Sequence, residues 1–110
     1  MIPRLFVDDP QRLVDFLRSV FGARGEYETE HPTMLQIGDA EIMVSAVGPR
    51  ERTSSCFYLY VDDADDTYAK ALQAGATSIE APDDMPWGDR RAIVTDPAGN
   101  DWQIATSQAG

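Results

Sequence analysis

Histidine and cysteine, which often act as catalytic bases, nucleophiles and metal ligands, are scarce in this 110-residue chain. The chain has one histidine, His31, and one cysteine, Cys56. A cysteine becomes a nucleophile only when a nearby base removes its proton, and His31, in a turn beside Pro32, is not placed to do so. We therefore expect Cys56 to be a buried, unreactive thiol and His31 to lie at the surface. The sequence also lacks a glycine-rich phosphate loop, a nucleophile elbow and a paired-cysteine metal motif.

The side chains that could bind a ligand occupy alternate positions of two predicted strands. The segments IPRLFV, residues 2–7, and CFYLYV, residues 56–61, both alternate in the manner of a half-buried strand. The aliphatic positions expected to face the core are Leu5, Val7, Leu59 and Val61. The opposite faces then carry Arg4, Phe6, Cys56, Tyr58 and Tyr60. Such a surface is aromatic and mostly apolar with a few hydrogen-bonding groups, which suits a planar small molecule of mixed polarity.

The arginine and tyrosine side chains of this set each have more than one possible role. The guanidinium of Arg4 needs an anion, which is either a carboxylate or phosphate of a ligand or, as we favour, an internal carboxylate. Tyr58 and Tyr60 could serve as general acids, but the ordinary pKa of a phenol is near 10 and no polarising partner is evident in the sequence. We interpret them as hydrogen-bonding walls of a site. Arg90 and Arg91, close to Trp87, lie either at the mouth of that site or on the surface.

The elements that must position these residues occur twice in the chain. The segments RLFVDDPQRLVDFLRSVFGA, residues 4–23, and YLYVDDADDTYAKALQAGA, residues 58–76, both run from a strand through Val-Asp-Asp into a helix and end at Gly-Ala. Asp9 and Asp63 are suited to cap these helices, and Gly22 and Gly75 to end them. The first helix has a clear apolar stripe: Leu13, Phe16, Leu17, Val20 and Phe21. The second has a weaker one: Ala64, Tyr68, Ala71 and Leu72.

Three strands are predicted after each helix, which makes each half a βαβββ module. They span about residues 24–30, 33–37 and 40–46 in the first half and 77–80, 90–95 and 100–106 in the second. The modules are residues 1–47 and 55–107 of one domain, joined by a polar linker at 48–54. One such unit covers only one face of its sheet with a helix. Two units, side by side or exchanged between chains, can curve their open faces around a shared cavity.

This duplication, with VDD opening each helix and DPAGNDWQIAT closing the second half, resembles the vicinal oxygen chelate superfamily. That superfamily includes glyoxalase, the bleomycin-resistance proteins and extradiol dioxygenases. The stretch PWGDRRAIVTDPAGNDWQIAT is especially similar to its small bleomycin-resistance-like members. The resemblance implies an α+β fold of two βαβββ modules whose curved mixed sheet surrounds a cavity, and it implies a homodimer. It does not fix a reaction, because this scaffold hosts unrelated chemistries.

The resemblance also implies where a metal ion would bind. In the metal-dependent members, His or Glu ligands come from the first and fourth strands of the modules. The matching positions here are Ile2, Met43, Cys56 and Gln103. None of these is His, Asp or Glu, the ligands that divalent ions prefer, so we expect no metal and no other cofactor. The predicted ligand-binding residues are Arg4, Phe6, Met43, Cys56, Tyr58, Tyr60, Trp87, Arg91 and Gln103.

Composition narrows the class of partner. Nineteen acidic and nine basic side chains give a formal charge of −10, which excludes nucleic acid as a natural partner and is compatible with a cationic ligand. No apolar run is long enough to span a membrane, and the single cysteine favours the cytoplasm. We expect a metal-independent small-molecule binding protein that sequesters a drug or a metabolite. The alternatives are a lyase, isomerase or dioxygenase of the same superfamily with a non-standard active site, and an accessory protein without a ligand.

Overall fold

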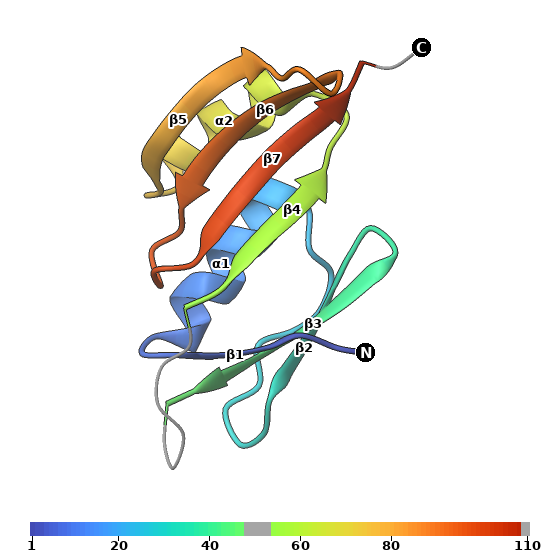
Figure 1. The fold of residues 1–110 in the computed structure, drawn as a ribbon. Coiled ribbons are helices and arrows are strands. Elements are labelled where there is room, and N and C mark those ends of the chain that lie inside the picture. The colour runs from blue at the N-terminus through green and yellow to red at the C-terminus, as the bar shows by residue number, and fades with distance from the viewer. Residues whose placement is uncertain (48–53, 109–110) are drawn as a thin grey trace.

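The computed structural model describes residues 1–47 and 54–108, so the expected linker at 48–54 lies almost entirely outside the described residues. The first half contains β1 (Arg4–Val7), α1 (Pro10–Phe21), β2 (Thr33–Ile37) and β3 (Ala40–Ala46). The second half contains β4 (Cys56–Tyr60), α2 (Ala64–Gln73), β5 (Thr77–Asp84), β6 (Asp89–Thr95) and β7 (Asp101–Ser107). The strands form one sheet in the order β1-β3-β2 and another in the order β4-β7-β6-β5 (Figure 1).

The two sheets repeat one topology, which confirms the predicted α+β fold. The strand before each helix pairs in parallel with the last strand of its own half, and the remaining pairs are antiparallel. In this register Arg4 lies beside Met43 and Tyr58 lies beside Gln103. Arg4 and Tyr58 are equivalent positions of the repeat. Their strand partners, Met43 and Gln103, are therefore equivalent positions as well.

Both helices begin at the predicted capping aspartates. The helix α1 ends at Gly22 as predicted, whereas α2 ends at Gln73 with Ala74 as its C-cap, one residue before the predicted Gly75. The Asp9 carboxylate accepts a hydrogen bond of 3.2 Å from the Arg12 N–H, and Asp63 accepts one of 3.1 Å from the Asp66 N–H. These bonds satisfy N–H groups that have no partner inside the first turn of a helix. Gly22 ends α1 in the left-handed conformation with φ of +67°, which glycine adopts without strain. None of the helices in the described part of the chain is long and apolar enough to cross a membrane.

The strand predicted at residues 24–30 is not formed. Only Arg24 pairs there, in an isolated antiparallel bridge to Gln36 with N–H···O distances of 2.9 and 2.8 Å. Gly25 then adopts φ of +140° and lies so close to the next strand that an added Cβ would be 2.5 Å from the Met34 carbonyl oxygen. Beyond it the segment alternates acidic residues with little apolar surface to bury. A 2.9 Å hydrogen bond from the Glu28 N–H to Oγ1 of Thr33 ties it to β2 in place of a strand ladder.

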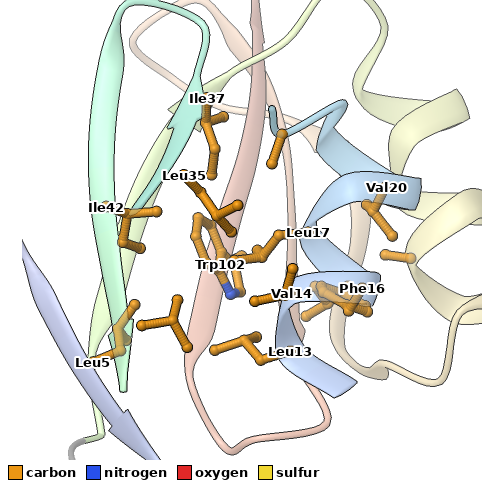
Figure 2. Close-up of a cluster of buried hydrophobic side chains, with 14 of the residues drawn as sticks. Leu5, Leu13, Val14, Phe16, Leu17, Val20, Leu35, Ile37, Ile42 and Trp102 are labelled. Atoms are coloured by element: carbon orange, nitrogen blue, oxygen red, sulfur yellow. The ribbon is translucent and has the colours of Figure 1, made fainter. Parts of the chain in front are cut away.

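One hydrophobic core joins the two halves. Leu13, Val14, Phe16, Leu17 and Val20 project from α1 into this core. Figure 2 shows the Trp102 side chain of β7 among Leu17, Leu35 and other aliphatic groups of the first half. The Trp102 ring also packs on Phe21 and Phe57, with centroids 4.9 and 4.7 Å apart. The stripe predicted for α2 is wrong in one position, because Leu72 is 38% exposed and Thr67 is buried instead.

The position of the core determines where the open sheet faces point. The helix-covered faces of both sheets contribute to the same core, with α1 against the smaller sheet and α2 against the larger (Figure 1). The opposite faces therefore point away from this core. Among the described residues, the cavity at Arg4 is lined by the first half alone, so Arg4 and Tyr58 lie on the open faces of different sheets.

Candidate functional site

The open face of the larger sheet carries a cluster of aromatic side chains around one carboxylate. The hydroxyl groups of Tyr58 and Tyr60 donate hydrogen bonds of 2.6 and 2.9 Å to Oδ2 of Asp89. The indole Nε1 of Trp87 lies 3.2 Å from the same oxygen and 3.2 Å from the Tyr58 hydroxyl. Tyr58 and Tyr60 come from β4, whereas Asp89 begins β6 and Trp87 lies in the preceding loop. We call these four residues the Asp89 cluster.

Burial and exposure divide this cluster into a fixed centre and an accessible rim. Asp89 is 5% exposed, but Tyr60 and Trp87 are 61% and 57% exposed and Tyr58 is 40% exposed. The two tyrosine rings meet edge to face with centroids 5.5 Å apart. The carboxylate therefore anchors the polar ends of three rings, while much of the ring surface remains available to a ligand.

The hydrogen bonds determine the charge state of the cluster. The bond from Tyr58 lowers the pKa of Asp89, with the bonds from Tyr60 and Trp87 adding to the effect, so the carboxylate is ionised at neutral pH. Partial burial and the bond to Asp89 raise the pKa of Tyr58. The bond to Asp89, followed by burial, raises the pKa of Tyr60. At neutral pH the cluster is thus one carboxylate held by two neutral phenols.

A second polar group lies beside the cluster on the same face. The Arg91 guanidinium donates hydrogen bonds of 3.0 Å to Oε1 of Gln103 and 2.8 Å to Glu80, and it lies 5.5 Å from the centroid of the Trp87 ring. Nε2 of Gln103 donates to Sγ of Cys56 at 3.6 Å. Nε of Arg91 is buried and makes no hydrogen bond within the described residues. Arg91 thus lies beside the Asp89 cluster on the open face of the sheet.

The predicted site residues of the first half lie apart from those of the second. Arg4 and Phe6 line a cavity of about 360 Å³ that is bounded only by residues of the first half. The Arg4 guanidinium lies 4.7 Å from the centroid of the Phe6 ring and donates a 3.4 Å hydrogen bond to Oγ of Ser45. Met43 is half-buried on the neighbouring strand. The internal ion pair favoured for Arg4 is not formed with any carboxylate in the described residues.

The expectation for Cys56 is corrected, and that for His31 holds. Cys56 is exposed rather than buried, because its position in β4 faces the open side of the sheet. His31 is at the surface as expected, 3.8 Å from the Glu28 carboxylate. However, its segment also borders the cavity that Arg4 lines, a position that the sequence did not reveal.

Asp89 and Glu80 are the site residues that the sequence analysis missed. The strand was predicted to begin at Arg90, which left Asp89 in the loop, and a shift of one residue is enough to hide an inward-facing side chain. The available signal was the pair Tyr58 and Tyr60, whose hydroxyl groups lie on one face of β4 and can reach across β7 to an acceptor on β6. The role of Glu80 was harder to predict, because β5 pairs with β6 through two register shifts and the partner of Glu80 cannot be found by counting residues.

The donor set implied by the resemblance does not fit a divalent metal ion. Ile2 offers no donor atom, and Met43 and Cys56 offer only sulfur, from different sheets. The Gln103 amide is already hydrogen-bonded at both ends, to Arg91 and Cys56. In the described part of the chain no group of three or more His, Cys, Asp or Glu side chains is arranged to hold a metal. No chemical step is therefore derived through a metal.

Comparison with known proteins identifies the family. Residues 3–104 match the model of the "Glyoxalase/Bleomycin resistance protein/Dioxygenase superfamily". The chain therefore belongs to this superfamily, as the two repeated modules indicate.

Relatives and solved structures agree with this assignment. The chain is 30% identical to an uncharacterized protein of Mycobacterium bovis, over 93% of this chain and 79% of that protein. It is 34% identical to CFP32 of the same organism, a protein named as a glyoxylase. This match spans 86% of the present chain but only 39% of CFP32. The crystal structure of TioX from Micromonospora sp. ML1 is 28% identical and superposes with a TM-score of 0.83, over 97% of both chains.

Proposed function

We propose that this protein binds a small organic molecule on the open face of the larger sheet and does so without a metal ion. The observation that carries the proposal is the Asp89 cluster. A buried, ionised carboxylate fixes Tyr58, Tyr60 and Trp87 while leaving their rings accessible. Accessible aromatic surface beside a few fixed polar groups is the usual composition of a small-molecule site.

The charge of the site favours a ligand with a cationic or hydrogen-bond-donating group. Asp89 and Glu80 contribute two negative charges, and Arg91, which pairs with Glu80, offsets one of them. Electron-rich aromatic faces attract cations, and the whole chain has a formal charge of −10. Membership of a superfamily that includes bleomycin-resistance proteins supports a drug or a metabolite as the ligand, which the protein would sequester in the cytoplasm.

A homodimer is part of this proposal. The open faces of one chain point away from its core and leave large aromatic groups exposed, including Tyr60 and Trp87. A second copy that covered these faces would exclude water from the site and strengthen its polar contacts. Analytical ultracentrifugation tests the assembly, and a protein that remains monomeric at the concentration at which it binds its ligand would contradict this part.

The same residues explain why binding is preferred to catalysis. A general base must accept a proton, but Oδ2 of Asp89 already accepts hydrogen bonds from two phenols and an indole. The raised pKa values of Tyr58 and Tyr60 keep both phenols protonated and make them weaker acids. A lyase, isomerase or dioxygenase is the second candidate function, because CFP32 is named as a glyoxylase and the superfamily includes enzymes.

A thermal-shift screen of antibiotics and metabolites tests the proposal, because a ligand that binds the native state raises the unfolding temperature. For a ligand found in this way, Tyr60→Ala should weaken binding at least ~10-fold, since a ring–ligand contact and a hydrogen bond are lost. Tyr68→Ala is the matched control, because Tyr68 lies on α2 and bonds Ser78 outside the cluster. Equal affinities for the wild type and Tyr60→Ala would remove Tyr60 from the site.

A further inference from the structure

A groove of about 510 Å³ lies where the last turn of α1 meets the end of β4 and the beginning of α2. We call it the α1–α2 groove. Phe21, Leu59 and Val61 line it, and all three also pack against the core, so the groove is on the helix side of β4. Tyr60 borders it at the end of the strand. A second copy that covers the open faces of the sheets would leave this side of the molecule accessible.

The rim of the α1–α2 groove is acidic. Asp62, Asp63 and Asp66 line it together with one lysine, Lys70, which leaves two net negative charges. Lys70 pairs with Asp66 at 3.1 Å. Asp62, by contrast, has no ion pair and no side-chain hydrogen bond within the described part of the chain. Because the chain as a whole has a formal charge of −10, its overall field adds to the attraction of a cation to this rim.

The side chain of Thr67 is a second, independent indication of a ligand. Thr67 lies on α2, lines the groove and is only 9% exposed. Its backbone N–H donates a 3.0 Å hydrogen bond to the Asp63 carbonyl, but its hydroxyl makes no hydrogen bond with any described residue. A hydroxyl that is largely removed from water and has no partner costs free energy. A hydrogen-bonding group of a ligand in the groove would remove this cost.

The arrangement of these groups does not suit a metal ion or an anion. Among the described residues no three acidic, cysteine or histidine side chains are close enough together to hold a metal. The first N–H groups of α2 are occupied, since Ala64 donates to Oγ1 of Thr106 at 2.7 Å and Asp66 to Oδ1 of Asp63 at 3.1 Å. Carboxylates spaced along one groove match positive charges that are spaced along a chain, and the apolar floor between them matches methylene groups.

We propose that the α1–α2 groove binds a linear aliphatic diamine or polyamine. Its ammonium groups bond the acidic rim and the Thr67 hydroxyl, and its methylene chain lies over Phe21 and Leu59. Hydrogen bonds between ammonium and carboxylate groups are of the strong, charge-assisted kind, and each buried methylene adds a favourable transfer free energy. The proposal does not rest on the function proposed above, because the carboxylate of the Asp89 cluster lies on the open face of the sheet.

Putrescine, a four-carbon diamine, provides a direct test with three matched controls. Titration followed by amide NMR shifts should show saturable binding, with the largest shifts at Phe21, Asp62 and Thr67. Butylamine has one charge, butanediol has none, and magnesium has two charges at a single point. Each should bind at least ~5-fold more weakly than putrescine, since none combines two separated charges with an apolar chain. Absence of saturable putrescine binding, equal binding of magnesium, or shifts centred on Tyr58 and Asp89 would overturn the proposal.

Substitutions separate a site in the groove from a general attraction to an acidic protein. Thr67→Val should weaken putrescine binding at least ~5-fold without lowering the unfolding temperature, because the lost hydroxyl has no partner in the fold. Asp62→Asn should weaken it by a similar factor. Asp15→Asn removes the same charge from an exposed residue of α1 outside the groove and should change the affinity less than about twofold. The aspartate pair decides the question if Thr67→Val destabilises the fold. Equal effects of the two aspartate variants, or unchanged affinity in a stable Thr67→Val, would overturn the proposal.

Discussion

The indole N–H of Trp102 donates a 2.8 Å hydrogen bond to Oδ2 of Asp96, at the corner between β6 and β7. The other carboxylate oxygen of Asp96 accepts bonds of 2.8 and 3.0 Å from the N–H groups of Ala98 and Asn100. Asp96 is buried, and Gly99 closes the turn with a bond of 3.1 Å to the Asp96 carbonyl. The DPAGN-x-W stretch is thus a structural corner, which explains why it identifies the fold but not the ligand.

Replacing Asp96 by alanine should destabilise the protein by about 2–4 kcal/mol, because a buried indole N–H and two backbone N–H groups lose their acceptor together. Urea unfolding followed by circular dichroism measures this change. Asp15→Ala is the control, since Asp15 is an exposed residue of α1 and its loss should change the free energy of unfolding by less than about 0.5 kcal/mol. If the two variants are equally stable, Asp96 does not hold the corner.

Most of the fold could be predicted from the sequence, because buried side chains recur with the period of the helix or strand that carries them. The stripe on α1 and the alternation of β1 and β4 follow from which side chains must leave water, and the core confirms both. The segment at 24–30 has no such pattern, and the strand predicted there does not form beyond the bridge of Arg24 to Gln36. A strand prediction without apolar alternation is therefore a weak one.

The candidate site could be predicted only in part, because its polar contacts join residues of different strands. Alternation correctly placed Tyr58, Tyr60 and Gln103 on the open face. The acceptor between the tyrosines, Asp89, depended on a strand boundary, and the edges of elements are the least well determined by local pattern. The separation of Arg4 from Tyr58 depends on how the two halves pack, which neither half encodes alone.

Leu17→Ala should lower the free energy of unfolding by about 2–5 kcal/mol, because Leu17 is fully buried and its truncation leaves a cavity beside Trp102. Leu72→Ala makes the same chemical change on α2 at a side chain that is 38% exposed. It should cost less than about 1 kcal/mol, since little apolar surface returns to water. Chemical unfolding of both variants gives the comparison, and a negligible effect of Leu17→Ala would contradict its place in the shared core.

The phenols of Tyr58 and Tyr60 should ionise only above the ordinary value of about 10, because their bonds to Asp89 and their burial raise both pKa values. A raised folded-state pKa stabilises the fold below about pH 10, and this contribution is lost as the pH rises through the folded-state value. Ultraviolet titration of tyrosinate, with circular dichroism to verify folding, measures the midpoints. Asp89→Asn should lower both, because the neutral amide no longer favours the protonated phenols. Unchanged midpoints in this variant would mean that Asp89 does not control the tyrosines.

Removal of divalent ions should leave both stability and ligand binding unchanged, because the four positions that hold metal in related enzymes supply no imidazole or carboxylate here. The experiment compares the unfolding temperature and the affinity for a screened ligand before and after dialysis against EDTA. Metal analysis of protein purified without chelator provides the complementary measurement, with less than about 0.1 ion per chain expected where no site binds tightly. Stoichiometric zinc, nickel, iron or manganese in the wild-type protein, lost together with ligand affinity on chelation, would instead support the enzymatic alternative.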